Sequence, residues 1–241
     1  MKIEEFGKEN EKIIVMLHGA YFVHTYGRQY PLAKNCHIIV PHIMGFGNET
    51  DRTFNTDACI AELADFIKSL NQKVMLVGFS LGAQLAFKLI CEHEELFSCA
   101  IIASPWLIKE EPFVSQIMEL NLKQNSQLKN KLICNFTAVM NGLIPAKIRK
   151  EFVEQCQNVT EETVRNVVCN GITLDSVPSF ANVSIPIVAL AGEKEEQAVQ
   201  DSVRKMAEIN KNCRYEIWSK AAHNIPPMFA KRFNELICSM L

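Results

Sequence analysis

The stretch Gly78-Phe79-Ser80-Leu81-Gly82 holds a serine between two glycines at G-x-S-x-G spacing. An apolar run at 74–77 precedes it, and apolar residues at helical spacing follow it. A strand that turns into a helix so abruptly strains the backbone of the serine and lifts its hydroxyl clear of the strand end. Ser80 is therefore a candidate nucleophile, and the alternative is a glycine-flanked turn whose serine only forms hydrogen bonds.

A serine nucleophile needs a base, because its hydroxyl attacks a carbonyl carbon poorly until its proton is removed. His223 is the candidate base, since it lies between the last predicted strand and the last predicted helix. An imidazole titrates near neutral pH and can return the proton to the leaving group. The alternative for His223 is a solvated loop histidine. A third group, a carboxylate, must hold the imidazole in the right tautomer.

The elements that must position these groups alternate between strands and helices. Helices are expected from residue 56 or 57, from the serine to about residue 96, over 197–209 and over 227–240. Continuous apolar runs predict strands that are buried on both faces. The alternation predicts an α/β fold with a parallel sheet covered by helices on both faces. The predicted strands are residues 2–6, 13–17, 36–40, 74–77, 100–103, 185–191 and 214–218.

Residues 106–182 break this alternation, because helical patterns follow one another there without a convincing strand. One strand–helix–strand unit needs only about 30 residues, so the excess predicts a helical cap insertion. We expect the cap over the carboxyl edge of the sheet, where ligands bind in open α/β sheets. The domains would then be a core of 1–105 and 183–241 and a cap of 106–182. The cap helices are predicted at 112–122, 128–141, 146–157 and 160–169. Some apolar cap residues either line a pocket or pack internally: Phe113, Ile117, Met118, Phe136, Met140 and Phe152.

Four features occur in a fixed order along the chain. His18-Gly19 follows the first core strand, G-F-S-L-G stands at 78–82, acids follow the strand at 185–191, and His223 follows the last strand. In this the sequence resembles the α/β-hydrolase superfamily of esterases, lipases, thioesterases and some peptidases. The resemblance implies an α/β-hydrolase fold, with a mostly parallel sheet of about six to seven strands flanked by helices and a helical cap insertion.

The resemblance also implies the remaining site residues. The G-x-x-D of the family maps onto Gly192-Glu193-Lys194-Glu195, so Glu195 would be the triad acid, with glutamate for the commoner aspartate. Glu193, Glu196 and Asp201 stay open as alternatives. The oxyanion hole would comprise the backbone N–H groups of Ala20 and Leu81. The histidine of His18-Gly19 would have a structural role in the oxyanion loop.

The chain departs from the family pattern in two places. Only 17 residues precede His18, so one of the two usual leading strands should be short or missing. The loop at 41–47 carries His42 where the family commonly has an aspartate. A serine at position 80 argues against the halide-releasing members, which use an aspartate nucleophile.

Composition limits the partners of the protein. The formal net charge is −2 and the sequence pI is about 6.3, so no basic surface suggests nucleic acid. No apolar run approaches the roughly 18 residues of a membrane span, and the first residues lack a signal-peptide core. We expect a cytoplasmic protein whose nine cysteines are reduced and mostly buried, because they form no C-x-x-C motif.

The functional hypothesis is a serine hydrolase that cleaves a small or medium acyl ester through an acyl-enzyme. It would need no metal and no organic cofactor, and its partner would be a small-molecule acyl substrate. Thioester, amide or C–C bond hydrolysis on the same triad is the alternative within enzymes. The alternative outside enzymes is a relative that binds a small ligand without turnover.

Overall fold

The computed structural model describes residues 1–143 and 145–241. In this part of the chain seven strands form one sheet in the order β1-β3-β2-β4-β5-β6-β7. Each pair of neighbours is parallel except β1 and β3, which are antiparallel. The strands are β1 (Ile3–Phe6), β2 (Ile13–Leu17), β3 (His37–Pro41), β4 (Val74–Phe79), β5 (Phe97–Ala103), β6 (Ile187–Gly192) and β7 (Cys213–Trp218).

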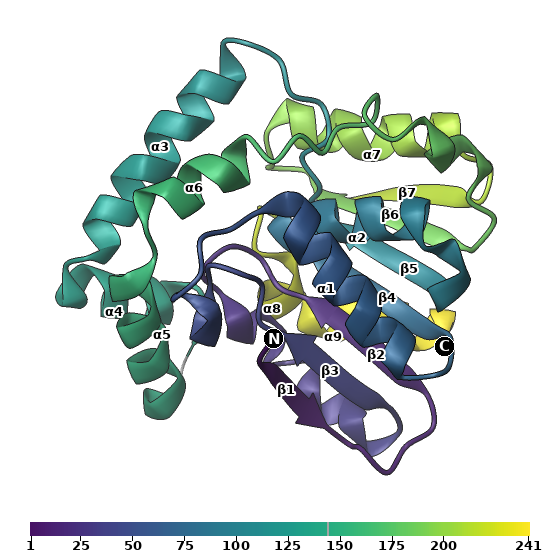
Figure 1. The fold of residues 1–241 in the computed structure, drawn as a ribbon, viewed down its shortest axis with the longest axis horizontal. Coiled ribbons are helices and arrows are strands. Elements are labelled where there is room, and N and C mark those ends of the chain that lie inside the picture. The colour runs from purple at the N-terminus through teal and green to yellow at the C-terminus, as the bar shows by residue number, and fades with distance from the viewer. Residues whose placement is uncertain (144) are drawn as a thin grey trace.

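Helices cover both faces of this sheet (Figure 1). The α-helices are α1 (Thr56–Ser69), α2 (Leu81–Glu92), α3 (Phe113–Leu128), α4 (Lys131–Met140), α5 (Ala146–Asn158), α6 (Glu161–Val168), α7 (Gln197–Ile209), α8 (Ile225–Met228) and α9 (Ala230–Met240). Short 3₁₀ helices are η1 (Val23–Tyr26), η2 (Tyr30–Lys34), η3 (Gly47–Glu49), η4 (Glu94–Leu96) and η5 (Pro178–Asn182).

The core is divided by the sheet into two apolar layers, because successive strand residues point to opposite faces. Val15 and Leu17 of β2 belong to the layer that includes buried residues of α1, α2 and α7. Ile14 and Met16 belong to the other layer, which includes Phe233 and other buried residues of α9. The continuous apolar runs therefore reflect burial on both sides, as predicted for parallel strands.

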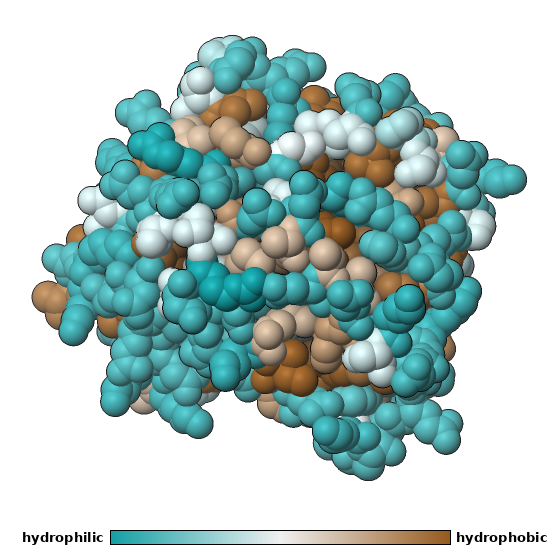
Figure 2. Space-filling model, in the orientation of Figure 1, coloured by the Kyte–Doolittle hydropathy of each residue, from teal (hydrophilic) through white to brown (hydrophobic). Residues whose placement is uncertain are grey.

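The helical insert lies between β5 and β6. Helices α3, α4, α5 and α6 gather at one side of the sheet, at the left in Figure 1. We call α3–α6 the cap helices. Several α4 side chains face away from the core, and Leu132, Phe136 and Met140 are exposed. Figure 2 shows that polar side chains cover most of the face in view, with apolar atoms between them.

The boundaries of two cap helices differ from the prediction. The sequence predicted one helix ending at residue 122 and a second beginning at 128, but α3 continues to Leu128. The polar stretch at 123–127 remains helical, and its Asn125 is buried and accepts a hydrogen bond from the Tyr21 hydroxyl (3.1 Å). The next helix begins only at Lys131, where the Asn130 side chain accepts from the first N–H groups of α4.

Other elements are close to the prediction, with three differences. β5 begins at Phe97 rather than at residue 100. β6 begins at Ile187, two residues later than predicted, directly after Pro186. The single helix predicted at 227–240 is divided into α8 and α9, because Phe229 leaves the helical conformation (φ −113°, ψ 36°). The predicted short leading strand is present as β1, which has four residues.

Two further observations concern the whole described chain. Over residues 1–143 and 145–241, no helix combines the length and the apolar character needed to cross a bilayer. The nine cysteines are free, and six of them are buried.

Gly82 provides a test of the packing beneath the nucleophile turn. A Cβ at this position would collide with the backbone carbonyls of Leu17 and His18, which cannot move without disturbing β2. We expect Gly82→Ala to lower the free energy of unfolding by at least ~3 kcal/mol in urea denaturation. Gly27→Ala is the matched control, because a Cβ there meets only the His24 carbonyl oxygen at 3.4 Å. Equal midpoints for Gly82→Ala and wild type would contradict this packing.

Candidate active site

Ser80 lies between β4 and α2 with φ 54° and ψ −115°, a strained conformation for a residue with a side chain. Its backbone N–H donates to the Ala103 carbonyl of β5 (2.9 Å), which fixes the turn against the sheet. A Cβ on Gly78 would collide with the Gly82 carbonyl, so the two glycines permit the close approach of strand and helix. The predicted strand–serine–helix turn is therefore present.

The structure brings Ser80, His223 and Glu195 together from three separate loops. His223 Nε2 lies 2.9 Å from Ser80 Oγ, and His223 Nδ1 lies 2.6 Å from Glu195 Oε1. A carboxylate only accepts hydrogen bonds, so Nδ1 is assigned the proton and Nε2 is left to accept from the serine hydroxyl. The His223 ring packs against Phe79 with its centroid 5.1 Å from the phenyl centroid.

The Glu195 carboxylate is buried, with 2% of its side chain exposed, whereas the His223 side chain is 55% exposed. Both of its oxygens accept hydrogen bonds. Oε1 faces His223, and Oε2 accepts from the Gly192 N–H (2.7 Å) and from the Ser104 hydroxyl (2.9 Å). Three donors therefore fix the carboxylate, and its orientation does not depend on the imidazole alone.

The other candidate acids point elsewhere. Glu193 accepts from the Lys220 N–H (2.7 Å) and the Ser219 hydroxyl (3.1 Å), and these bonds hold its pKa below the ordinary value. Asp201 pairs with Arg204 on α7 (2.9 Å). Glu196 lies just before α7 and lines the same cavity as Ser80, but no hydrogen bond joins it to His223 in the described chain. Glu195 alone among these acids contacts the imidazole.

The two residues predicted for the oxyanion hole lie beside the nucleophile, since both Ala20 and Leu81 line the cavity that contains Ser80. Leu81 is the first residue of α2, so its N–H has no partner within the helix. The N-terminus of this helix also carries a partial positive charge that favours an anion. The oxyanion loop approaches Ser80 closely, because a Cβ on Gly19 would lie 3.3 Å from the Ser80 Cβ.

His18 is buried behind this loop and joins it to the loop after β3. Its Nε2 accepts from the Ile43 N–H (3.0 Å), so Nδ1 carries the proton and donates to the Gly19 carbonyl (2.7 Å). Burial lowers the pKa of His18 to about 3. A neutral ring with both nitrogens engaged agrees with a structural role and is unsuited to proton transfer.

The cavity above Ser80 has a volume of about 480 Å³, within the usual range for small-molecule sites. Phe113 and Ile117 of α3 line it, while Phe152 is buried elsewhere and stacks on Phe22. Phe136 and Met140 are exposed. The cap therefore contributes to the cavity chiefly through α3 and the end of α6. The apolar lining residues are Ala20, Leu81, Trp106, Phe113, Ile117, Val167, Val168, Val199 and Ala222.

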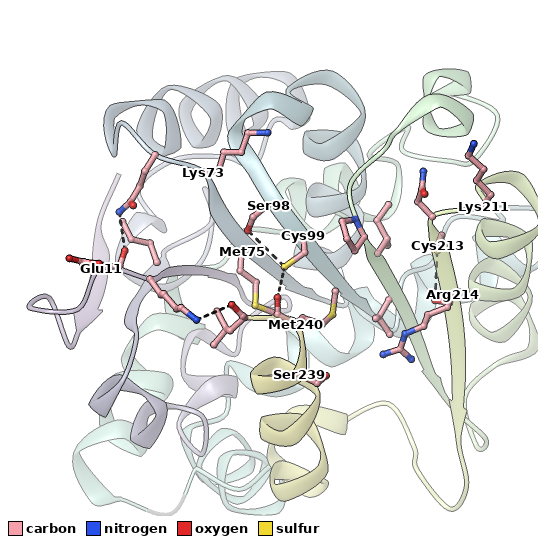
Figure 3. Close-up of a pocket in the computed structure, with 18 residues that line it drawn as sticks. Glu11, Lys73, Met75, Ser98, Cys99, Lys211, Cys213, Arg214, Ser239 and Met240 are labelled. Carbon is pink, nitrogen blue, oxygen red and sulfur yellow. Dashed lines mark hydrogen bonds between the residues drawn. The ribbon is translucent and has the colours of Figure 1, made fainter.

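A larger cavity of about 810 Å³ opens at the amino ends of the strands (Figure 3). It is bordered by Ser98 and Cys99 of β5 and by Cys213 and Arg214 of β7. The Cys99 thiol donates to the Met240 carbonyl there (3.4 Å). Ser80 and His223 are absent from its lining, so the smaller cavity at the carboxyl ends is the candidate active site.

The sequence matches the alpha/beta hydrolase family over residues 14–236. The chain belongs to this family. A search of curated proteins gave no match to this alpha/beta hydrolase.

Solved structures share its fold. MenH from S. aureus is 22% identical with a TM-score of 0.76, and the match covers 100% of this chain and 97% of that one. A thermophilic esterase from Thermogutta terrifontis is 17% identical with a TM-score of 0.72, covering 99% and 91% of the two chains. A bromoperoxidase from Bacillus anthracis is 16% identical with a TM-score of 0.78, covering 99% and 94%. Identities this low establish a common fold and leave the reaction of this alpha/beta hydrolase open.

Sequence reasoning did not find two residues that border the site. Ser104 is not among the residues predicted from the sequence, yet its hydroxyl donates to the Glu195 carboxylate (2.9 Å). Its position at the carboxyl end of a parallel strand was the available signal. Gln84 is predicted only as one residue of the helix that follows Ser80. Its spacing of one helical turn from the nucleophile was the signal that it lines the cavity.

The buried neutral His18 predicts a specific loss of stability in acid. The unfolded chain binds a proton at this residue with a pKa of about 6.5, whereas the folded chain resists protonation until about pH 3. Unfolding is therefore favoured as pH falls from about 6.5, by up to ~1.4 kcal/mol per pH unit. We expect wild type to lose about 2 kcal/mol more than His18→Gln between pH 7 and pH 5, measured by urea denaturation. Parallel losses in the two proteins would show that folding does not lower the pKa of His18.

Proposed function

We propose that this alpha/beta hydrolase is a serine hydrolase that cleaves carboxylic esters with a small or medium acyl group. The observation that carries the proposal is the continuous chain of hydrogen bonds from Glu195 through His223 to Ser80, which ends at an open cavity. The predominance of apolar walls in that cavity supports an acyl substrate. The esterase from Thermogutta terrifontis shows that this fold can carry ester hydrolysis.

The proposed reaction follows from the arrangement of the three side chains. Ser80 Oγ attacks the ester carbonyl carbon as His223 Nε2 takes its proton, and the Glu195 carboxylate stabilises the charged imidazolium. The carbonyl oxygen gains negative charge and accepts from the N–H groups of Ala20 and Leu81. His223 then protonates the leaving alcohol, which departs and leaves an acyl-enzyme on Ser80. His223 then takes a proton from a water molecule, which attacks the acyl-enzyme. The carboxylic acid departs, and the proton returns to Ser80.

Thioesters and amides would react with the same groups. An alcohol leaves more readily than an amine, which favours esters over amides. A thiol leaves at least as readily as an alcohol, so leaving-group ability does not separate esters from thioesters. A series of p-nitrophenyl esters from acetate to laurate, compared with one thioester of matched acyl length, separates these substrates. The higher kcat/KM on the ester is the expected result. A clear thioester preference would replace the ester assignment and keep the nucleophile.

Ser80 is tested by covalent labelling. A fluorophosphonate probe should label wild type at Ser80, located by peptide mass spectrometry, and should not label Ser80→Ala. Hydrolysis of p-nitrophenyl butyrate should fall at least about 10³-fold in this variant, because no other group accepts the acyl chain. Labelling that persists in Ser80→Ala would remove Ser80 from the role. A wild type that neither labels nor hydrolyses would favour a ligand-binding protein.

Glu195 is tested against its acidic neighbours. Glu195→Gln should lower kcat by about 10²- to 10⁴-fold, because an amide cannot stabilise the imidazolium and favours the wrong tautomer. Glu193→Gln, Glu196→Gln and Asp201→Asn are the matched controls and should change kcat less than about threefold, since none contacts His223. Circular dichroism verifies that each variant is folded. A larger loss in any control than in Glu195→Gln would reassign the acid.

A further inference from the structure

Gln84 lies on α2 one helical turn after Ser80, so the two side chains share a face of the helix. Only 6% of Gln84 is exposed, and it lines the same cavity as Ser80 and His223. A polar side chain so deeply buried needs hydrogen-bond partners for both ends of its amide. The positions of those partners determine what the amide can do.

The orientation of the Gln84 amide is set by Asn170, and the orientation of Asn170 is set by two groups that can only donate. Lys109 Nζ and the Ile172 N–H both donate to Asn170 Oδ1, at 2.5 Å and 2.9 Å. An ammonium group and a backbone N–H cannot accept, so the Oδ1 and Nδ2 positions of Asn170 are fixed. Asn170 Nδ2 therefore donates to Gln84 Oε1, at 2.8 Å. The oxygen of Gln84 is satisfied, and its Nε2 is left as a pure donor.

No hydrogen bond joins this Nε2 group to another residue among 1–143 and 145–241, whereas the side-chain oxygen accepts from Asn170. Asn170 is itself buried and is tethered at its carbonyl by the Thr56 hydroxyl (3.0 Å). The Lys109 ammonium is directed at Asn170 and at the Val168 carbonyl, and it does not line the cavity. An oriented neutral donor is therefore carried by a residue of the cavity wall that also includes Ser80.

We propose that Gln84 is a specificity-determining residue whose amide N–H donates to a neutral carbonyl oxygen on the acyl chain of the substrate. The inference rests on the proposed function, because it assigns Ser80 to the ester carbonyl and Gln84 to a second oxygen of the same substrate, and both residues line one cavity. His223 must lie beside the leaving group to protonate it, so the acyl chain is the part assigned to α2. Lys194, Glu195 and Glu196 all border the cavity. The Gln84 amide itself offers a donor without a positive charge, which suits a neutral carbonyl oxygen.

The test compares two esters of nearly equal shape. The p-nitrophenyl ester of 4-oxopentanoate carries a keto oxygen where that of 4-methylpentanoate carries a methyl group. The quantity measured is kcat/KM for the oxo ester divided by kcat/KM for the methyl ester. We expect this ratio to fall about tenfold from wild type to Gln84→Met, because one buried hydrogen bond is lost. Comparing this ratio between wild type and variant cancels the intrinsic reactivity difference between the esters.

Two further variants keep the result interpretable. Gln84→Glu preserves the acceptor for Asn170 and replaces the donor with an oxygen, so it should lose the preference as well. Gln124→Met is the matched control, since Gln124 also lines the cavity but is exposed and makes no side-chain hydrogen bond in the described chain. This control should keep the wild-type ratio. An unchanged ratio in both Gln84 variants, or an equal fall in the control, would overturn the inference.

Failure of the proposed function is distinguishable from failure of this inference. If wild type hydrolyses both esters with a ratio that Gln84 does not affect, the nucleophile assignment stands and the inference is wrong. If wild type hydrolyses neither, Ser80→Ala protein is titrated with the methyl esters of the two acids, and the side-chain ¹⁵N–¹H signals of Gln84 are followed. A shift with the oxo compound alone supports the inference. Equal shifts, or none, overturn it.

Discussion

The strained backbone of Ser80 is the constraint on which the site depends. Such a conformation costs about 1–3 kcal/mol, and it persists only because the surrounding structure leaves no alternative. Here β4 and the first two turns of α2 are buried against β2 and β5, and two glycines remove the side chains that would separate them. The packing energy of the sheet therefore maintains the direction of one hydroxyl group.

The other groups of the site follow from the same sheet. Ser80, Ser104, Glu195 and His223 come after β4, β5, β6 and β7, which are successive neighbours. Parallel order brings their following loops to one edge, so residues distant in sequence become adjacent without a dedicated scaffold. The cap helices contribute to the walls of the cavity. Ser80, Glu195 and His223 all follow strands of the sheet. Part of the cavity wall and the hydrogen-bonded side chains of Ser80, His223 and Glu195 therefore come from different parts of the chain.

Much of this arrangement was predictable, because buried parallel strands are continuous apolar runs. The runs at 13–17 and 185–191 located β2 and β6 to within two residues, and the fold is confirmed. The order of Ser80, an acid and His223 predicted their proximity, which the geometry shows, while their catalytic roles remain predictions. Glu195 could not be separated from Glu193 by spacing alone, since the tight loop after Gly192 decides which carboxylate turns inward.

The remaining features depended on contacts that periodicity does not encode. Nothing in the stretch at 123–127 signalled that Asn125 would be buried against Tyr21, so the continuity of α3 was missed. The break at Phe229 follows two prolines, yet prolines also begin helices, and the pattern alone could not separate the cases. Gln84 acquires its orientation from Asn170 and Lys109, which lie in the insert and are far away in sequence.

Asn170 also has a mechanical consequence. It lies two residues after the end of α6, where the polypeptide leaves the cap helices, and it bonds both the Thr56 hydroxyl of α1 and the Gln84 side chain of α2. A displacement of α6 away from α1 and α2 would break these two hydrogen bonds and free the Gln84 amide to rotate. The position of the last cap helix and the orientation of a side chain in the cavity wall are therefore linked through one asparagine.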